Sequence, residues 1–172
     1  MKKTAYLILL ILGTTFGTQA QSETSIIPRP SEIESQEGGF FLTRNIKLFS
    51  SKSLEEERHF FQKELLRFKK IPSVNQYNKE EAKIQFIKSS SPSDHLYQLK
   101  ISTDRIVINA HTQKGAFYGA VSLLQMINNA EQTKNGIRLP CIRIKDHPDY
   151  QWRGLMLDES RHFFGKEKVK SL

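Results

Sequence analysis

The residues best suited to chemistry lie together near the end of the sequence, in the run WRGLMLDESRHFF. Its short apolar part, GLML, predicts a buried strand that delivers Asp158, Arg161 and His162 at its C-terminal end. In β/α repeats this is the end at which functional groups lie. Asp158 could therefore brace a binding pocket, with Arg161 and His162 shaping the first loop. The interpretation that we favour for these three residues is an internal ion pair that holds the loop in place.

The elements that must position these side chains are a strand, a polar loop and a helix that begins near Lys166. Together they form the first unit of a β/α repeat. The break at His147 and Pro148 predicts a domain boundary, which gives predicted domains of residues 21–146 and 147–172. A barrel of eight such units needs at least about 200 residues, whereas 25 residues follow His147 in this chain of 172. We therefore expect only the start of an incomplete barrel.

The composition is that of a folded protein. With 38% hydrophobic residues and a formal net charge of +8, the chain is neither disordered nor collagen-like. The densest basic groups, Lys69 with Lys70 and the run KEKVK at 166–170, are far apart in the sequence. We interpret them as solvated surface and helix-end charges. A protein that binds nucleic acid or an anionic glycan is the hypothesis that we rank last, because the phenylalanines are expected on buried helix faces.

The N-terminus has the pattern of a targeting segment. Lys2 and Lys3 precede the apolar run YLILLILG, and Thr18, Gln19 and Ala20 follow as a small-x-small cleavage pattern. This predicts a signal peptide over residues 1–20 and export to the periplasm or the cell exterior. The apolar run is too short to span a bilayer comfortably, so we expect no membrane span.

The cysteine and histidine positions argue against a metal site. Cys141 is the only cysteine in the sequence, so neither an intrachain disulfide nor a cysteine cluster can form. His59, His95, His111 and His147 fall in separate predicted elements without ligand spacing. We expect no metal and no cofactor.

The first half of the chain predicts strands and one helix. The segment IIPRPSE enters in an extended form, and EIESQ and FFLT are expected as two strands around a turn at Gly38 and Gly39, before a short strand at IKLF. The helix is predicted from Ser53 to Lys70. Ser53 and Glu56 form a predicted capping box. The residues expected on its buried face are Leu54, Phe61, Leu65 and Phe68.

The second half predicts three strands beginning at Lys83, Leu96 and Arg105, and then a helix from Gln113 to Asn129. A turn at Asn135 and Gly136 leads into a last strand. The residues expected on the buried face of this helix are Phe117, Val121, Leu124 and Ile127, while Gly115 and Gly119 suit close packing against a sheet. The element order predicts an α+β fold, a small mostly antiparallel or mixed sheet with two helices.

Several of these runs together are similar to a known family. The run WRGLMLDESRHFF, preceded by IKDHPDY, by QKGAFYGAVSLLQMI and by the opening IIPRPSEIE, resembles the junction between the N-terminal domain and the catalytic barrel of glycoside hydrolase family 20. That family comprises the exo-acting β-N-acetylhexosaminidases. The resemblance covers nearly the whole sequence after the predicted signal peptide.

The resemblance implies removal of a terminal N-acetylhexosamine from glycans or chitin-like oligomers, with retention of configuration. In that family the 2-acetamido oxygen of the substrate attacks the anomeric carbon, an Asp orients the acetamido group, and the adjacent Glu is the general acid/base. This Asp–Glu pair belongs to a later barrel strand. We therefore expect no catalytic residue in this chain, and we expect the 172 residues alone to be inactive.

One substrate-binding residue is implied by the resemblance. Arg153 matches the arginine that binds hydroxyls of the terminal sugar, and a guanidinium presents donors that suit vicinal hydroxyls. Without the motif, an arginine beside Trp152 would be interpreted as a surface stacking or ion-pair residue. The expected partner is thus a glycan substrate and not nucleic acid. The alternative from another functional class is a non-catalytic, secreted carbohydrate-binding or scaffold module.

Overall fold

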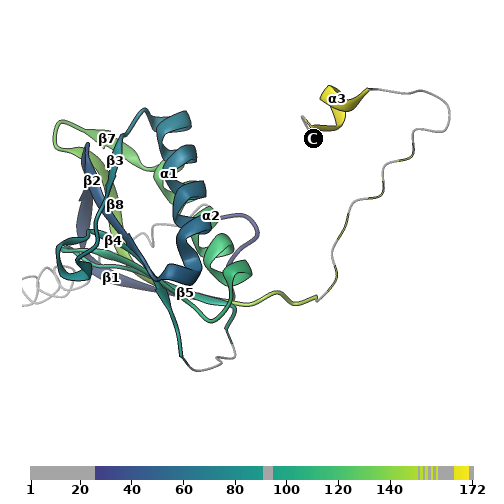
Figure 1. Ribbon diagram of the computed structural model, residues 1–172, viewed down its shortest axis with the longest axis horizontal. Helices are drawn as coiled ribbons and strands as arrows, with labels where there is room; N and C mark the ends of the chain where they lie inside the picture. Colours follow the sequence, from purple (N-terminus) through teal and green to yellow (C-terminus); the bar gives the residue numbers. More distant parts are fainter. Residues whose placement is uncertain are drawn as a thin grey trace, which may run out of the picture.

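The computed structural model describes residues 26–90 and 95–150, Trp152, Gly154, Met156, Asp158, and residues 165–170. The described fold is α+β, as the sequence predicts: two helices lie on one face of a mixed sheet (Figure 1). The helices are α1 (Glu55–Lys69), α2 (Gln113–Asn129) and the short α3 (Lys166–Lys170). The strands are β1 (Glu32–Leu42), β2 (Ile46–Ser50), β3 (Ser73–Asn75), β4 (Ile84–Lys88), β5 (Tyr97–Ile101), β6 (Ile106–Ala110), β7 (Glu131–Thr133) and β8 (Gly136–Asp146).

The sheet joins a parallel half to an antiparallel half. Its strand order is β1-β8-β5-β6-β4-β2-β3, and β7 pairs with β8 beside this path. Strands β3, β2, β4 and β6 are mutually parallel, whereas β5 is antiparallel to both β6 and β8. The predicted strands from Lys83, Leu96 and Arg105 are confirmed. The three-residue strands β3 and β7 were not predicted, because three residues are too few for a periodic pattern.

The predicted Gly-Gly turn is wrong. β1 is one strand of 11 residues, and its pairing with β8 shifts register between Ser35 and Gly39. Gly38 has a φ of +105° at this β-bulge, and a Cβ there would lie 2.8 Å from Thr103 Cγ2. The glycine pair therefore lets a long strand absorb extra residues instead of reversing the chain.

The helix α1 begins later than predicted, and its capping box is not formed. Residues Lys52–Leu54 make a 3-10 turn, and the helix begins at Glu55 without a side-chain cap. Leu54, Phe61 and Leu65 are buried as expected, but Phe68 is 61% exposed. Phe68 lies in the last turn, where the Arg67 guanidinium sits 5.0 Å from its ring centroid.

The helix α2 has the predicted ends, but of the four residues expected on its buried face only Ile127 is buried. The face against the sheet carries small residues, so the helix approaches the strands closely: a Cβ on Gly115 would lie 2.1 Å from the Leu96 carbonyl oxygen, and one on Gly119 2.7 Å from Ile108 Cγ2. The role predicted for the two glycines is confirmed.

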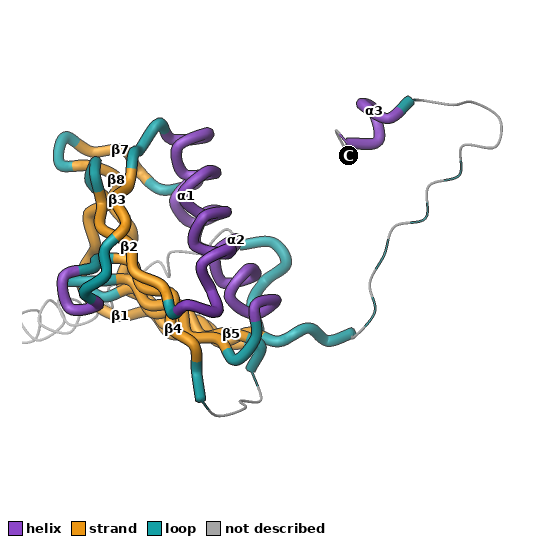
Figure 2. The backbone as a smooth tube through the Cα atoms, in the orientation of Figure 1, coloured by secondary structure: helices purple, strands orange, loops and turns teal. Residues whose placement is uncertain are grey.

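Phe117, expected in the core, instead contacts Phe60 of α1 at 4.8 Å between ring centroids. Figure 2 shows the two helices side by side over the strands. The residues of α2 that are buried are Gly115, Ala116, Gly119, Ala120, Ser122, Leu123, Met126 and Ile127.

Candidate functional site

Of the predicted site residues, the structure describes Asp158, whereas Arg153, Arg161 and His162 lie outside the described residues. Asp158 is exposed and belongs to neither a helix nor a strand. The roles of these four residues stay predictions.

The predicted buried strand at GLML is wrong for the residues described in it. Gly154 and Met156 are not in a strand, and the Met156 side chain is 92% exposed. A strand needs a partner for its backbone hydrogen bonds, and every strand pair of the described sheet lies between Glu32 and Asp146. The helix expected from Lys166 is present as α3.

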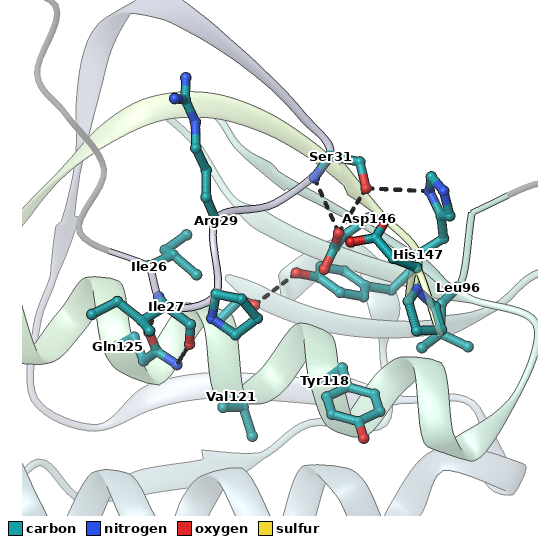
Figure 3. Close-up of a pocket in the computed structure, with 15 residues that line it drawn as sticks. Ile26, Ile27, Arg29, Ser31, Leu96, Tyr118, Val121, Gln125, Asp146 and His147 are labelled. Atoms are coloured by element: carbon teal, nitrogen blue, oxygen red, sulfur yellow. Dashed lines mark hydrogen bonds between the residues drawn. The ribbon is translucent and has the colours of Figure 1, made fainter. Parts of the chain in front are cut away.

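The most developed polar site lies where the chain leaves β8 toward this run. A pocket of about 300 Å³ forms between the N-terminal segment 26–31, one side of α2 and residues 146–149 (Figure 3). We call it the junction pocket. Its apolar wall includes Ile26, Leu96 and Val121. The junction pocket therefore joins the first and last parts of the α+β domain.

A polar clasp closes one side of the junction pocket. The Ser31 backbone N–H and hydroxyl both donate to Asp146 Oδ1, at 3.1 and 3.0 Å. His147 Nδ1 lies 3.2 Å from the same hydroxyl oxygen. Beside the clasp, a hydrogen bond from Lys145 Nζ (2.9 Å) lowers the pKa of the Glu32 carboxyl below its usual value. The clasp fixes the end of β8 to a segment 115 residues earlier.

The clasp is not arranged as a nucleophilic triad. In such a triad the histidine accepts the serine proton, and the carboxylate holds the other ring nitrogen. Here Ser31 donates its proton to Asp146, which leaves His147 to donate to the hydroxyl oxygen. The geometry therefore supports a structural role for the clasp and not acyl transfer.

The opposite side of the junction pocket is held by α2. Gln125 Oε1 accepts from the Ile27 N–H at 2.8 Å, and Gln125 Nε2 donates to the Ile27 carbonyl at 3.0 Å. Deeper in, the Tyr97 hydroxyl is 2.7 Å from Ser122 Oγ. Burial raises the pKa of Tyr97 to about 12, although its hydrogen bond with Ser122 acts in the opposite direction. Tyr97 is therefore a neutral hydrogen-bonding group at physiological pH.

The described residues contain no group of three or more His, Cys, Asp or Glu side chains that could hold a metal ion. No described helix is long and apolar enough to cross a membrane. Cys141 is buried in β8, where burial raises the pKa of its thiol.

The clasp was not predicted from the sequence. Its partners are separated by more than a hundred residues, and no local pattern links them. The one available signal was that prolines bound both segments, in IIPRPS and in DHPD, which indicated extended chain at each place.

Comparison with known proteins identifies this architecture. The model of glycosyl hydrolase family 20, domain 2, matches residues 23–147, a range that contains the whole described sheet. The chain belongs to glycosyl hydrolase family 20. The resemblance that the sequence indicated is thereby confirmed.

Relatives in family 20 are much longer than this chain. The β-hexosaminidase of Vibrio furnissii is 28% identical over 148 residues, which cover 86% of this chain and 23% of the relative. The β-N-acetylhexosaminidase of Cellulomonas fimi is 34% identical over 79 residues, which cover 46% and 16%. Among solved structures, the exo-β-N-acetylglucosaminidase of Vibrio harveyi, in complex with N-acetylglucosamine, has a TM-score of 0.72 at 25% identity over 86% of this chain and 23% of that one. The chain thus spans under a quarter of the length of these relatives.

Proposed function

We propose that this chain is the N-terminal part of a β-N-acetylhexosaminidase. In this proposal the catalytic domain follows the α+β domain in the chain, and its first residues come after the clasp at Asp146 and His147. The observation that carries the proposal is the order of two segments along the chain. The family 20 match ends at residue 147, and the run WRGLMLDESRHFF begins at Trp152, after four intervening residues.

The proposed substrate is a glycan with a terminal, non-reducing N-acetylhexosamine. The name of the Cellulomonas fimi relative and the N-acetylglucosamine bound to the Vibrio harveyi enzyme both support this substrate class. We further propose the retaining, substrate-assisted mechanism, in which the acetamido oxygen of the sugar is the nucleophile. The Asp–Glu pair that this mechanism needs would come from outside the 172 residues.

Within this chain, Arg153 is the proposed substrate-binding residue. Its guanidinium would donate to two neighbouring hydroxyls of the terminal sugar, a geometry that lysine cannot reproduce. The clasp fixes the chain at Asp146, seven residues before Arg153. Asp158, Arg161 and His162 are proposed to stabilise the loop that follows.

The proposed location is outside the cytoplasm, by means of the signal peptide over residues 1–20. The expected N-terminus of the exported protein is Gln21. N-terminal sequencing of the exported protein tests this, and an uncleaved protein that stays in the cytoplasm would contradict it.

A domain exchange tests the proposed function. Residues 26–172 would replace the corresponding region of the Bacteroides fragilis β-N-acetylhexosaminidase, a structural relative with a TM-score of 0.71. Release of nitrophenol from nitrophenyl N-acetylglucosaminide is the readout. We expect turnover by the hybrid and none by the 172-residue chain. A folded but inactive hybrid, together with binding of N-acetylglucosamine oligomers by the chain alone, would favour a non-catalytic carbohydrate-binding module instead.

Arg153 is tested in the same hybrid. Arg153→Ala should raise KM at least tenfold with a smaller change in kcat, and Arg153→Lys should restore little of the loss. Arg67→Ala removes an exposed arginine of α1 that does not line the junction pocket, and it serves as the matched control, with unchanged KM. An unaffected KM in Arg153→Ala would contradict the assignment.

A further inference from the structure

A second pocket lies where three connections of the domain meet. It is formed by the β1–β2 turn, the C-terminal end of α1 and the β7–β8 turn, and it has a volume of about 350 Å³. Four of its lining residues are cationic: Arg44 from the first turn, Lys69 and Lys70 from α1, and Lys134 from the β7–β8 turn. None of the described residues that line it is acidic. We call it the basic pocket.

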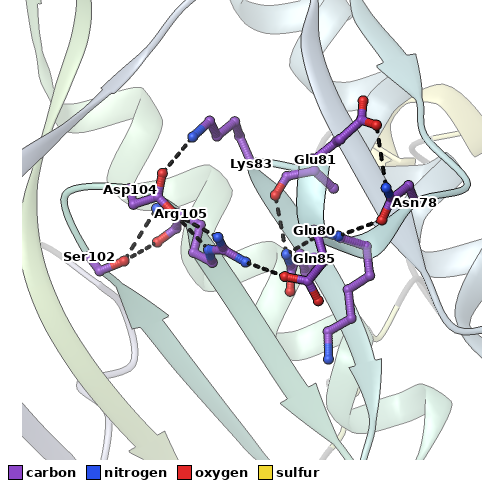
Figure 4. A network of polar contacts seen from close by, with 10 residues as sticks. Asn78, Glu80, Glu81, Lys83, Gln85, Ser102, Asp104 and Arg105 are labelled. Atoms are coloured by element: carbon purple, nitrogen blue, oxygen red, sulfur yellow. Dashed lines mark hydrogen bonds and ion pairs between the residues drawn. The ribbon is translucent and has the colours of Figure 1, made fainter.

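The cations of the basic pocket differ from those of an ion-pair network elsewhere on the domain. In the network between β4 and the β5–β6 turn, Lys83 Nζ is 2.5 Å from Asp104 Oδ1, and Arg105 contacts both Asp104 (2.8 Å) and Glu80 (3.8 Å) (Figure 4). By contrast, no described carboxylate lies within 4.0 Å of a basic-pocket cation. Unmatched charges of one sign around a concave surface raise the local concentration of oppositely charged ligands.

The basic pocket is held open by contacts between its turns. The Asn45 N–H donates to the Pro72 carbonyl at 2.9 Å, which joins the β1–β2 turn to the segment after α1. Gly136 packs so closely on the same turn that a Cβ would lie 2.4 Å from the Leu42 carbonyl oxygen. The Lys69 ammonium donates to the Asn128 carbonyl at 3.0 Å, which ties the ends of the two helices together. The pocket is therefore formed before any ligand binds.

Helix ends offer a simpler explanation for some of these charges, but not for all. Basic residues at a helix C-terminus interact favourably with its dipole, which accounts for Lys69 and Lys70. Lys70, however, has a φ of 56°, at the left-handed cap position where glycine is the usual residue. Arg44 and Lys134 lie on turns between strands, where no helix dipole requires a cation. Helix capping therefore does not explain why Arg44 and Lys134 line the same pocket as the two lysines.

The neutral groups of the pocket indicate the class of ligand. Thr43, Thr133 and Asn135 add hydroxyl and amide groups, and the lining also includes the buried side chains of Leu42 and Ile137. The volume is in the range of small-ligand sites, which suits one or two sugar rings better than a nucleic-acid duplex. No aromatic residue is among its described lining residues, so it offers no platform for stacked bases.

We propose that the basic pocket binds an anionic saccharide, with sulfate or carboxylate groups on the four cations and sugar hydroxyls on the threonine and asparagine side chains. The site is separate from the junction pocket, and the proposal does not depend on hexosaminidase activity. It revises the interpretation of Lys69 and Lys70 as helix-end charges alone.

Calorimetric titration of the full chain with a heparin-derived sulfated tetrasaccharide tests the proposal. The variant R44Q/K134Q removes the two turn cations, both exposed, and should weaken binding at least tenfold. The variant K79Q/K114Q removes the same net charge from exposed positions on other elements and should change the Kd less than twofold. Circular dichroism and the thermal midpoint, expected to be unchanged in both variants, exclude misfolding as the cause.

Three results would overturn the proposal. Equal weakening by both variants would show that binding follows overall charge and needs no pocket. Equal affinity for the desulfated tetrasaccharide would show that the cations do not recognise the anionic groups. A short DNA duplex that binds as tightly, and is lost with R44Q/K134Q, would assign the pocket to nucleic acid instead.

Discussion

The α+β domain contributes the buried core of the chain, whereas the stretch after it contributes the residues proposed to contact substrate. The domain has a core of buried apolar residues, in which Phe61, Leu99 and Ile108 are fully buried. Beyond Pro148 the described aromatic and apolar side chains are exposed, Trp152 by 87% and Met156 by 92%. Yet the second region holds the run that most resembles the catalytic barrel of the family. The residues that determine folding and those proposed to contact substrate thus occupy different parts of the chain.

The largest expected contrast between the two regions comes from removing an apolar side chain. Phe61→Ala leaves a cavity beneath α1 beside Phe86, whose ring centroid is 5.8 Å away, and should lower the free energy of unfolding by about 3–5 kcal/mol. Met156→Ala should change it by less than about 0.5 kcal/mol, because the side chain is already in solvent. Urea unfolding followed by circular dichroism measures both. A comparable loss in the two variants would end the distinction between the regions.

The next contrast uses one substitution at two glycines. In Gly115→Ala the new methyl group meets the Leu96 carbonyl oxygen at 2.1 Å, so α2 must move away from the sheet. We expect a loss of about 1–3 kcal/mol. In Gly154→Ala the nearest atoms belong to the Trp152 ring at 3.7 Å, an ordinary contact. Thermal unfolding should show a lower midpoint for the first variant only, and an unchanged midpoint for Gly115→Ala would mean that the close helix–sheet approach is not required.

A smaller effect is expected from pH, and it should come from the domain alone. The unfolded chain releases the Tyr97 proton near the ordinary pKa of 10, whereas the folded protein keeps it until about pH 12. The unfolded state therefore binds fewer protons in this window, and stability falls as pH rises from 10 to 12, by about 2 kcal/mol.

Tyr97→Phe is the variant that isolates this effect. It should remove most of the fall between pH 10 and 12 and cost about 1 kcal/mol at neutral pH, where Ser122 loses its partner. A chain that ends at Tyr150 should show the same pH dependence as the full chain. If shortening the chain abolished the fall, the titrating group would lie in the second region.

Local patterns predicted much of the fold. The ends of α2 agree with prediction because Thr112 caps its N-terminus, with its hydroxyl accepting from the Gly115 N–H at 3.1 Å. The face that α2 buries was mispredicted, because the close approach permitted by Gly115 and Gly119 outweighed the apolar spacing of Phe117 and its neighbours. The bulge at Gly38 depends on pairing with β8, a hundred residues later, and so has no local signal.

The candidate sites depended still more on tertiary structure. The clasp joins Ser31 to Asp146, and the basic pocket gathers Arg44, Lys69 and Lys134 from three separate connections. In the sequence these cations are dispersed, which is why surface solvation was the natural interpretation. Only the register of β1 on β8 and the path of α1 bring them together.

Residue-resolved amide hydrogen exchange on the full chain tests the division between the two regions most directly. Amides of β5, β6 and β8 should exchange only through global unfolding, whereas those of Trp152, Gly154 and Met156 should exchange at nearly the rate of an unstructured peptide. Strong protection of Gly154 and Met156 would show a strand paired within this chain, and would contradict the account.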